Sequence, residues 1–237
     1  MTALGMQSHA ATDPGTKRRL NEDSYLDRPE IGLWAVADGV GGASAGEVAS
    51  AAVCDALGSI EAGLSGEQML HAVRERLQGV HRDLLVRGAG ATIASTVVVL
   101  IVAGGYFACL WAGDSRIYLL HGGELRRLTR DHSLVQAMVD DGNLTEAEAA
   151  HHPRANVITR AVGAGEGELA LDKVVGEVRA GDRFLLCSDG LTKALEEAEL
   201  AGLLGMPDGV AHAELLVQAA LARQASDNVT AVTVEVG

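Results

Sequence analysis

The sequence predicts an α+β fold in which antiparallel sheets are covered by helices. Two observations carry this prediction. Short apolar runs rich in Val, Ile and Leu are separated by glycine pairs, and stretches with helical spacing come in pairs between groups of these runs. Hairpin signals outnumber single helical crossovers, which disfavours a doubly wound parallel sheet. No Pro- or Ser-rich linker divides the chain, so we expect residues 1–237 to form a single domain.

The expected strands follow one another in a meander. Gly104-Gly105 and Gly122-Gly123 each separate two apolar runs and are typical of hairpin turns. Gly113-Asp114-Ser115 marks a further turn between them. The strands expected on this basis are Ile31–Ala37, Thr92–Ala103, Tyr106–Ala112, Arg116–His121, Glu124–Leu128, Arg183–Cys187 and Val229–Val236.

The expected helices each carry apolar residues on one face. Ser65–Val86 opens with a capping-box pattern formed by Ser65 and Gln68. Its apolar residues recur at helical spacing, namely Met69, Val73, Leu77, Val80 and Leu84. The other helices expected are Ala45–Ala62, Leu134–Asp141, Thr145–Ala150, Glu196–Leu204 and Val210–Gln224.

Composition excludes several classes of protein. The chain has 19 Lys and Arg against 32 Asp and Glu, and this net charge of −13 disfavours nucleic acid or an anionic membrane as a partner. Hydrophobic residues make up 48%, enough for a sizeable core. The longest apolar run, Val97–Ala103, is too short to span a membrane, and Met1–Arg19 lacks a signal-peptide core. Because Cys54, Cys109 and Cys187 are odd in number and widely spaced, we expect a cytoplasmic protein with buried free thiols.

One acidic pattern recurs four times. An apolar strand ends and an Asp follows next to Gly, Ser or Asn, as at Asp38, Asp114, Asp189 and Asp227. Each instance alone is typical of a turn. Four carboxylates brought together at strand ends would repel one another unless a cation neutralised them. Because all these donors are hard oxygens, without a Cys/His set at zinc spacing, the pattern favours magnesium or manganese.

A basic segment and a glycine-rich segment bear on the interpretation of these carboxylates as a metal site. Lys17-Arg18-Arg19 directly precedes Asn21-Glu22-Asp23. This is either a solvated charge run or a guanidinium placed for a phosphate oxygen beside a carboxylate metal site. The glycine-rich stretch Asp38–Gly46 lacks the Lys-Ser/Thr ending of a P-loop and the spacing of a dinucleotide fingerprint. Its glycines favour a tight turn in which a backbone carbonyl approaches a metal.

Two other phosphatase chemistries are disfavoured. A cysteine nucleophile would need a Cys-x5-Arg loop, but the residue at that spacing from Cys187 is Lys193, and Asp189 adds an unwanted negative charge. An aspartyl-phosphate mechanism would want a second Asp two residues from Asp38, where Val36 stands.

Eight segments together identify a family resemblance. They are, in chain order, Arg18–Asp23, Ala37–Gly42 with Gly46-Glu47, Gly90–Thr92, Gly113–Arg116, Leu128–Ser133, Asn156–Ala161, Ser188–Gly190 and Ser226–Asn228. In this order they resemble the motifs of the metal-dependent serine/threonine protein phosphatases of type 2C, in their compact bacterial form. The likeness covers nearly the whole chain. It implies a four-layer α-β-β-α sandwich, in which two antiparallel sheets are flanked by pairs of helices and metals lie in a cleft at the sheet ends.

The resemblance also implies a set of metal ligands for two core Mn2+ or Mg2+ ions. Asp38 would bridge the two ions, and the Gly39 carbonyl would bind one of them. Asp189 and Asp227 would complete the first site. Asp114, with help from Asp189, would hold the third metal often seen in bacterial members.

Further positions match the family more loosely. Glu22 and Asp23 match positions that line the second metal, directly or through water. Arg18 matches the phosphate-binding arginine. Asn156 occupies a place near the third metal and a mobile flap, which would cover Ser133–Glu168 here.

The implied activity is hydrolysis of phosphoserine and phosphothreonine on proteins by a metal-activated water. Arg18 and the metals would stabilise the oxygens of the transition state, without a covalent enzyme intermediate. The partners implied are phosphorylated proteins, with the chain acting as a monomer that opposes a bacterial Ser/Thr kinase. Two alternatives stay open: a catalytically silent binding module on the same scaffold, and a phosphatase dedicated to a sigma-factor regulator.

The chain departs from the family at one position of interest. Some members place a His directly after the metal-binding Asp-Gly as a proposed general acid, and many bacterial members carry one slightly later. Here these positions are Val40 and Ala43, neither of which can donate a proton. His132 is an available histidine, and a metal-bound water is the other candidate for the proton donor.

Overall fold

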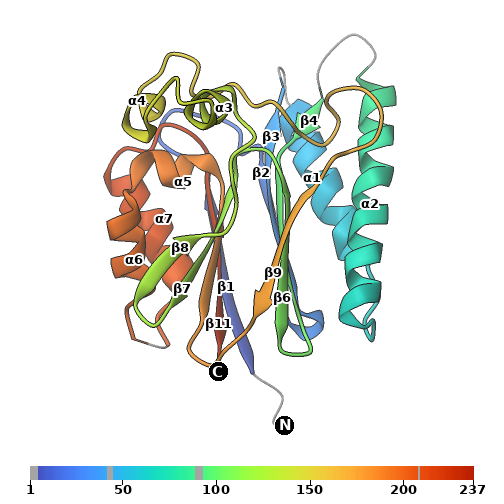
Figure 1. The fold of residues 1–237 in the computed structure, drawn as a ribbon, viewed down its shortest axis with the longest axis vertical. Helices are drawn as coiled ribbons and strands as arrows, with labels where there is room; N and C mark the ends of the chain where they lie inside the picture. The colour runs from blue at the N-terminus through green and yellow to red at the C-terminus, as the bar shows by residue number, and fades with distance from the viewer. Residues whose placement is uncertain (1–4, 42–44, 89–92, 208) are drawn as a thin grey trace.

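The computed structural model describes residues 5–41, 45–88, 93–207 and 209–237. Two β-sheets pack face to face, and helices cover the outer face of each sheet (Figure 1). Every strand pairing is antiparallel. The predicted α+β fold with four layers is therefore confirmed.

The first sheet contains the two ends of the described chain. Its strands run in the order β1 (Met6–Asp13), β11 (Val229–Val236), β10 (Arg183–Cys187), β7 (Arg116–His121) and β8 (Glu124–Arg127). The second sheet has the order β2 (Asp23–Arg28), β3 (Leu33–Val40), β5 (Val97–Ala103), β6 (Tyr106–Ala112) and β9 (Asp172–Glu177). The short strand β4 (Ala94–Ser95) pairs with the end of β3, and a 3-10 turn, η1 (Pro29–Ile31), joins β2 to β3.

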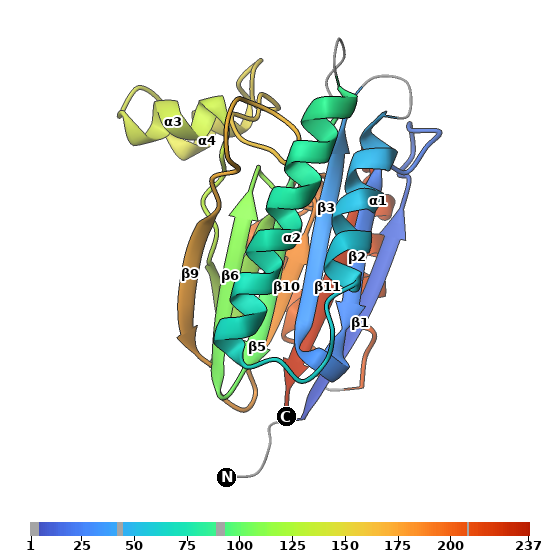
Figure 2. The ribbon, with the colours of Figure 1, turned by 90° about the vertical axis from the view of Figure 1, so that its right-hand side faces the viewer.

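The helices divide between the two outer faces and one end of the molecule. On the second sheet lie α1 (Ala45–Gly58) and α2 (Gly66–Arg87), as Figure 2 shows face-on. On the first sheet lie α5 (Asp189–Ala194), α6 (Glu197–Leu204) and α7 (His212–Ala222). The remaining two, α3 (Leu134–Asp140) and α4 (Glu146–Ala150), project beyond the sheets. The capping box predicted for α2 is present, because Ser65 and Gln68 each bond to the other's backbone N–H.

The alternation of side chains along β3 explains why this strand is apolar on both faces. Trp34 and Val36 pack into the core between the sheets, while Leu33, Ala35 and Ala37 pack against α1 and α2. Each sheet is thus buried on both sides, once by the other sheet and once by helices. Because both faces are buried, the central strands are continuous apolar runs in the sequence, and these runs made the strands predictable.

Three strands and one helix were not predicted. The strands β1, β2 and β9 lie at sheet edges, where β1 and β2 are largely half-buried and β9 is mostly exposed, so their sequences mix polar and apolar residues without a clear period. The helix α5 has only six residues, too few for a helical pattern to be recognised. The expected strand Thr92–Ala103 is interrupted at Thr96 between β4 and β5, and its first residue lies outside the described residues.

The three cysteines are buried and unpaired, as predicted. Burial raises the pKa of the Cys54 and Cys187 thiols to about 12, so neither is available as a thiolate at neutral pH. This agrees with the exclusion of a cysteine nucleophile. None of the helices in the described part of the chain combines the length and apolarity that crossing a bilayer requires.

The packing of α2 generates a stability prediction. Leu77 is fully buried against the second sheet, whereas Val86, on the same helix, has a relative exposure of 78%. Leu77→Ala should lower the free energy of unfolding by about 2–5 kcal/mol because it leaves a cavity. Val86→Ala should change it by no more than about 0.5 kcal/mol. Urea denaturation of both variants tests this, and equal losses would contradict the assigned packing.

Candidate active site

The ends of several strands meet at one cavity of about 240 Å³. Its lining comes from both sheets, since β3 belongs to one sheet while β10, followed by α5, and β11 belong to the other. We call it the acidic cavity. The residues that line it are Arg18, Glu22, Asp38, Gly39, Val40, Gly41, Thr96, Asp114, Asn156, Ile158, Asp189, Lys193, Asp227 and Asn228.

The backbone of Asp38 is fixed by its neighbours in the second sheet. Its N–H donates to the Thr96 hydroxyl at 3.0 Å, and its carbonyl accepts from the Thr96 N–H at 2.8 Å and from the Ser95 hydroxyl at 3.1 Å. The Thr96 hydroxyl is also 2.7 Å from that of Ser115, which follows Asp114. The break between β4 and β5 at Thr96 thus ties the turn of Asp114 to the end of β3.

Asn228 holds the loop that carries Arg18. Its side-chain oxygen accepts from the Glu22 N–H at 2.8 Å, and its amide nitrogen donates to the carbonyls of Pro14 and Leu20 at 3.0 and 2.9 Å. One side chain at the start of β11 therefore bonds both ends of the segment between Pro14 and Glu22. This explains how a polar segment without secondary structure is brought to the cavity.

Two glycines allow α1 to approach the end of β3. A Cβ atom at Gly39 would lie 2.1 Å from the Gly46 carbonyl oxygen and 2.7 Å from that of Glu22. A Cβ at Gly46 would lie 2.8 Å from the backbone of Gly39. Neither position therefore accepts a side chain without a backbone shift. The glycine-rich stretch serves close backbone packing here, while Gly42 lies outside the described residues.

Asp23 lies behind the acidic cavity rather than on its wall. It is 7% exposed and stands opposite Asp38 in the pairing of β2 with β3. One of its oxygens, Oδ2, accepts hydrogen bonds of 2.7 Å from the hydroxyls of Ser188 and Thr230. The other, Oδ1, is buried without a hydrogen-bond partner among the described residues. Burial raises the pKa of Asp23 to about 7.

The pKa values of three carboxyl groups that line the cavity, those of Asp38, Asp114 and Asp189, are raised as well. Burial, followed by the charge of Asp23, raises the pKa of Asp38 well above its ordinary value. Burial, followed by the charge of Asp189, raises the pKa of Asp114 to about 7. Burial also raises the pKa of Asp189. The carboxyl groups are thus near enough to disfavour one another's ionisation, which is the repulsion that the sequence pattern indicated.

Two cationic side chains partly offset this charge. The Lys193 ammonium lies 2.5 Å from Asp189 Oδ2 and 3.6 Å from Asp227 Oδ2, and Arg18 Nε lies 2.9 Å from Asp227 Oδ1. Among the described residues, no three acidic, histidine or cysteine side chains are already arranged as a set of metal ligands. The groups that could hold a cation are carboxylates and backbone carbonyls, and two of these carboxylates are ion-paired with protein cations.

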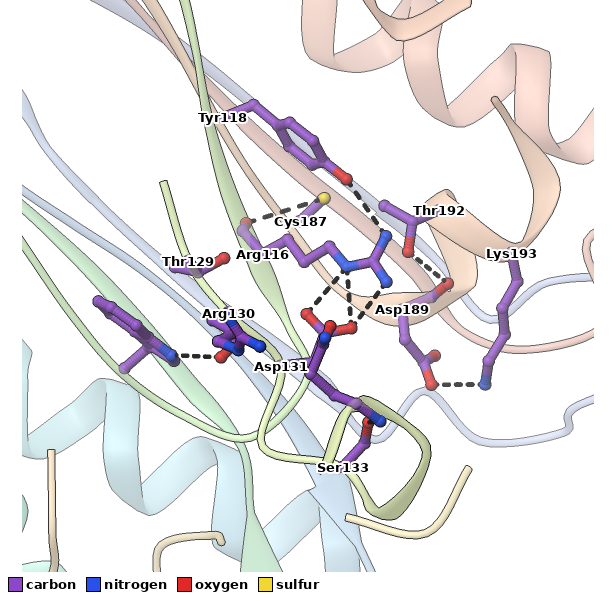
Figure 3. A network of polar contacts seen from close by, with 12 residues as sticks. Arg116, Tyr118, Thr129, Arg130, Asp131, Ser133, Cys187, Asp189, Thr192 and Lys193 are labelled. Carbon is purple, nitrogen blue, oxygen red and sulfur yellow. Dashed lines mark hydrogen bonds and ion pairs between the residues drawn. The ribbon is translucent and has the colours of Figure 1, made fainter. Parts of the chain in front are cut away.

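A further ion pair, between Arg116 and Asp131, lies outside the lining of the cavity. Arg116 on β7 binds Asp131 with two nitrogens, at 2.7 to 3.1 Å, and its third nitrogen lies 3.3 Å from the Tyr118 hydroxyl (Figure 3). Asp131 follows β8, in the segment that leads to α3. The pair therefore links the first sheet to the start of the projecting helices, beside the Asp189–Lys193 pair.

A profile of the protein phosphatase 2C family matches residues 16–224. The chain belongs to this family. It is 37% identical to the serine/threonine protein phosphatase PstP of Mycobacterium tuberculosis over 98% of its own length, and it spans 45% of the length of that relative.

Solved structures of family members have the same fold. PppA, a key regulatory component of T6SS in Pseudomonas aeruginosa, is 42% identical and superposes with a TM-score of 0.88, over 98% of both chains. The catalytic domain of PstP in complex with two manganese ions is 35% identical, with a TM-score of 0.84 over 99% of both chains.

Most residues that the family resemblance singled out lie on the acidic cavity. Its walls include Arg18, Glu22, Asp38, Gly39, Asp114, Asn156, Asp189 and Asp227. Val40 also lines it with an exposed side chain, and Ala43 lies outside the described residues.

His132 is not part of the cavity wall. Its Nδ1 accepts the Gly113 N–H at 3.2 Å, its Nε2 lies 3.3 Å from Asp172 Oδ2, and its ring stacks on Trp111. Burial lowers the pKa of this histidine. A neutral ring held on both nitrogens orients the turn before Asp114 and is poorly placed to donate a proton in the cavity.

Sequence reasoning missed the contribution of three groups. Lys193 was considered only as the residue that stands where a cysteine-loop motif requires Arg. Its spacing of four residues from Asp189 in a helix would have indicated an ion pair. Thr96 carried no sequence signal, because its role depends on the break between β4 and β5. The hydroxyl of Ser188, although it lies in a recognised motif, was not expected to bind Asp23.

The raised pKa values predict how the metal-free protein responds to pH. Folded Asp23 holds its proton up to about pH 7, whereas the unfolded side chain releases it near its ordinary value of 3.8. The folded state thus binds more protons in this window, so stability falls as the pH rises through it. In chelator, the unfolding free energy should be lower at pH 8 than at pH 5.5.

Asp23→Asn should flatten this pH dependence, because the amide carries no charge and can still accept the hydroxyls of Ser188 and Thr230. Asp83→Asn, at an exposed position of α2, should leave the slope unchanged. Chemical denaturation at several pH values measures both. An unchanged slope in Asp23→Asn would contradict the burial and repulsion assigned to this group.

Proposed function

We propose that this chain hydrolyses phosphoserine and phosphothreonine in proteins, with divalent cations held at the acidic cavity. The observation that carries the proposal is the lining of one cavity by four Asp side chains and by Arg18, in a chain of the protein phosphatase 2C family. A lining of carboxylates alone would repel a phosphate. With cations bound, the same lining attracts one.

The residues present suit manganese or magnesium. All the acidic donors are hard oxygens, and the buried Asp23 Oδ1 has no partner among the described residues, which is costly for a polar atom unless a water or cation reaches it. The relative PstP, solved in complex with two manganese ions, supports the same inference. The ligand set that we propose for two core ions and a third is Asp38, the Gly39 carbonyl, Asp114, Asp189 and Asp227, with Glu22 and Asp23 acting directly or through water.

Cations bound there would supply Lewis-acid chemistry, by activating water as the nucleophile and neutralising charge on the phosphate. The chain itself fixes the position of the donors. The Asp38 N–H donates to the Thr96 hydroxyl and the Asp38 carbonyl accepts from the Ser95 hydroxyl, so the carboxylate projects from a rigid strand end. A rigid donor set needs little reorganisation during the reaction.

Arg18 is the residue best placed to bind the substrate phosphate. Its side chain is 53% exposed at the rim of the cavity, and its loop is held by Asn228. Its Nε pairs with Asp227 Oδ1 at 2.9 Å, and a guanidinium can turn its fork towards two phosphate oxygens. Arg18 would thus orient the phosphate and stabilise negative charge on its oxygens.

The proposal also covers the domain organisation, oligomeric state, location and substrates of the chain. We propose that residues 1–237 form one catalytic domain that acts as a monomer in the cytoplasm, on phosphoproteins made by a Ser/Thr kinase. Support for one domain comes from the core between the sheets, to which both sheets contribute along their length. Support for the substrate class comes from the relatives, which are named serine/threonine phosphatases.

The first test of the function is metal-dependent hydrolysis of a phosphothreonine peptide. We expect activity with manganese and none in excess chelator. Asp38→Asn should abolish the manganese-dependent rate, because it removes a charge at the centre of the proposed ligand set. Asp55→Asn, at an exposed position of α1, should retain it. Full activity of the wild type in chelator would contradict the proposed chemistry.

A second test concerns Arg18. Arg18→Ala should lower kcat/KM for the phosphopeptide by about 10- to 100-fold, which corresponds to the loss of a charged hydrogen bond. The matched control is Arg19→Ala, because Arg19 is exposed on the same loop and does not line the cavity. Steady-state kinetics compares the two variants. Equal effects would indicate general electrostatic attraction instead of a specific phosphate contact.

A further inference from the structure

The placement of Lys193 in the acidic cavity depends on a rigidly docked helix. Lys193 stands one turn after Asp189 on α5. Within this helix Leu191 is fully buried, and a Cβ at Gly190 would lie 2.0 Å from the Asn228 carbonyl oxygen. The backbone of α5 is thus packed tightly against the start of β11. The backbone of Lys193 is therefore held at the wall of the cavity, and its side chain extends from there.

The ammonium of Lys193 faces the centre of negative charge. Figure 3 shows Lys193 and Asp189 pointing towards one another, and Nζ lies 2.5 Å from Asp189 Oδ2 and 3.6 Å from Asp227 Oδ2. The charge of Asp114 acts on the same ammonium. The side chain remains 41% exposed, so it can swing into solvent without opening the core.

The oxygens that Lys193 contacts are among those that the proposed function assigns to divalent cations. An ammonium at 2.5 Å from Asp189 Oδ2 and a divalent cation bound to the same oxygen would repel each other strongly at such short separation. Asp227 is engaged twice in this way, since Arg18 contacts its other oxygen at 2.9 Å. Cation binding to these two residues thus requires protein charges to move.

We propose that Lys193 is a built-in competitor for the divalent cations of this site. It neutralises Asp189 and Asp227 when metal is absent, and it must be displaced before these carboxylates can bind metal. This inference rests on the proposed function. The competition is expected to fall on Asp189 and Asp227, the two carboxylates that the ammonium contacts. There Lys193 supplies positive charge that a bound cation would otherwise provide.

Manganese binding by isothermal titration calorimetry tests this proposal without relying on activity. Lys193→Met removes the charge and keeps most of the aliphatic stem. We expect its weakest manganese site to bind about tenfold more tightly than in the wild type, or an additional ion to bind. Lys193→Arg, which keeps the charge, should resemble the wild type. So should Lys173→Met, at an exposed position of β9 away from the cavity.

Thermal unfolding separates competition from a merely structural ion pair. In chelator, Lys193→Met should unfold at a lower temperature than the wild type, because the carboxylates lose their counter-charge. In millimolar manganese this difference in unfolding temperature should disappear or change sign. A lower unfolding temperature in both conditions, with unchanged manganese affinity, would overturn the proposal. Lys193→Gln provides the same comparison should Lys193→Met fail to fold.

Manganese binding by the wild type distinguishes a failure of the proposed function from a failure of the competition. Wild-type protein that binds no manganese at millimolar concentration would overturn both the metal-dependent function and the role of Lys193. Wild-type protein that binds manganese, with equal affinity and stoichiometry in Lys193→Met, would leave the function intact and overturn the competition alone.

Discussion

Mutual repulsion among buried carboxylates is the constraint on which the rest of this structure depends. Five Asp side chains lie on or just behind one cavity, and their pKa values rise wherever a shift is resolved. The fold holds two of them through neutral groups, because the Asp38 backbone bonds to Thr96 and the Asp23 carboxyl to Ser188 and Thr230. The positions of Asp38 and Asp23 therefore do not depend on either carboxyl group being charged. A site held in this way can exist with or without its counter-ions.

The sandwich places the two halves of the site on different sheets. Asp38 comes from the second sheet, while Asp189 and Asp227 flank strands of the first. The distance between them is set by the core between the sheets, where Trp34 of one sheet and Phe184 of the other are fully buried. Packing far from the chemistry therefore determines the spacing of the charged groups. This is why the fold needs interdigitated apolar side chains behind a polar site.

The central strands and the four Asp positions were predictable because burial on both faces leaves long apolar runs, each of which stops at a carboxylate. Edge strands such as β1 and β9 were not, because a strand that is half-buried or mostly exposed imposes a weak pattern on its sequence. The residues alone left Arg18 open between a solvated charge run and a phosphate site, and the family resemblance was needed to choose, since its loop is held by a distant residue, Asn228. The ion pair of Lys193 with Asp189 lies within sequence range, but it becomes visible only once α5 is recognised as a helix.

The pairing of β1 with β11 has a practical consequence for handling this protein. Asp13 pairs with Val229 beside the acidic cavity, whereas Met6 pairs with Val236 at the other end of the same strands, roughly 23 Å away at the rise of an extended chain. Met6 and Val236 thus lie side by side, at the end of these strands that is remote from the cavity, and Figure 1 shows β1 and β11 running together to this end. An affinity tag, a fluorophore or a surface tether attached next to either of these residues would leave the cavity open to solvent. The same geometry would let the whole fold be spliced into a surface loop of a host protein.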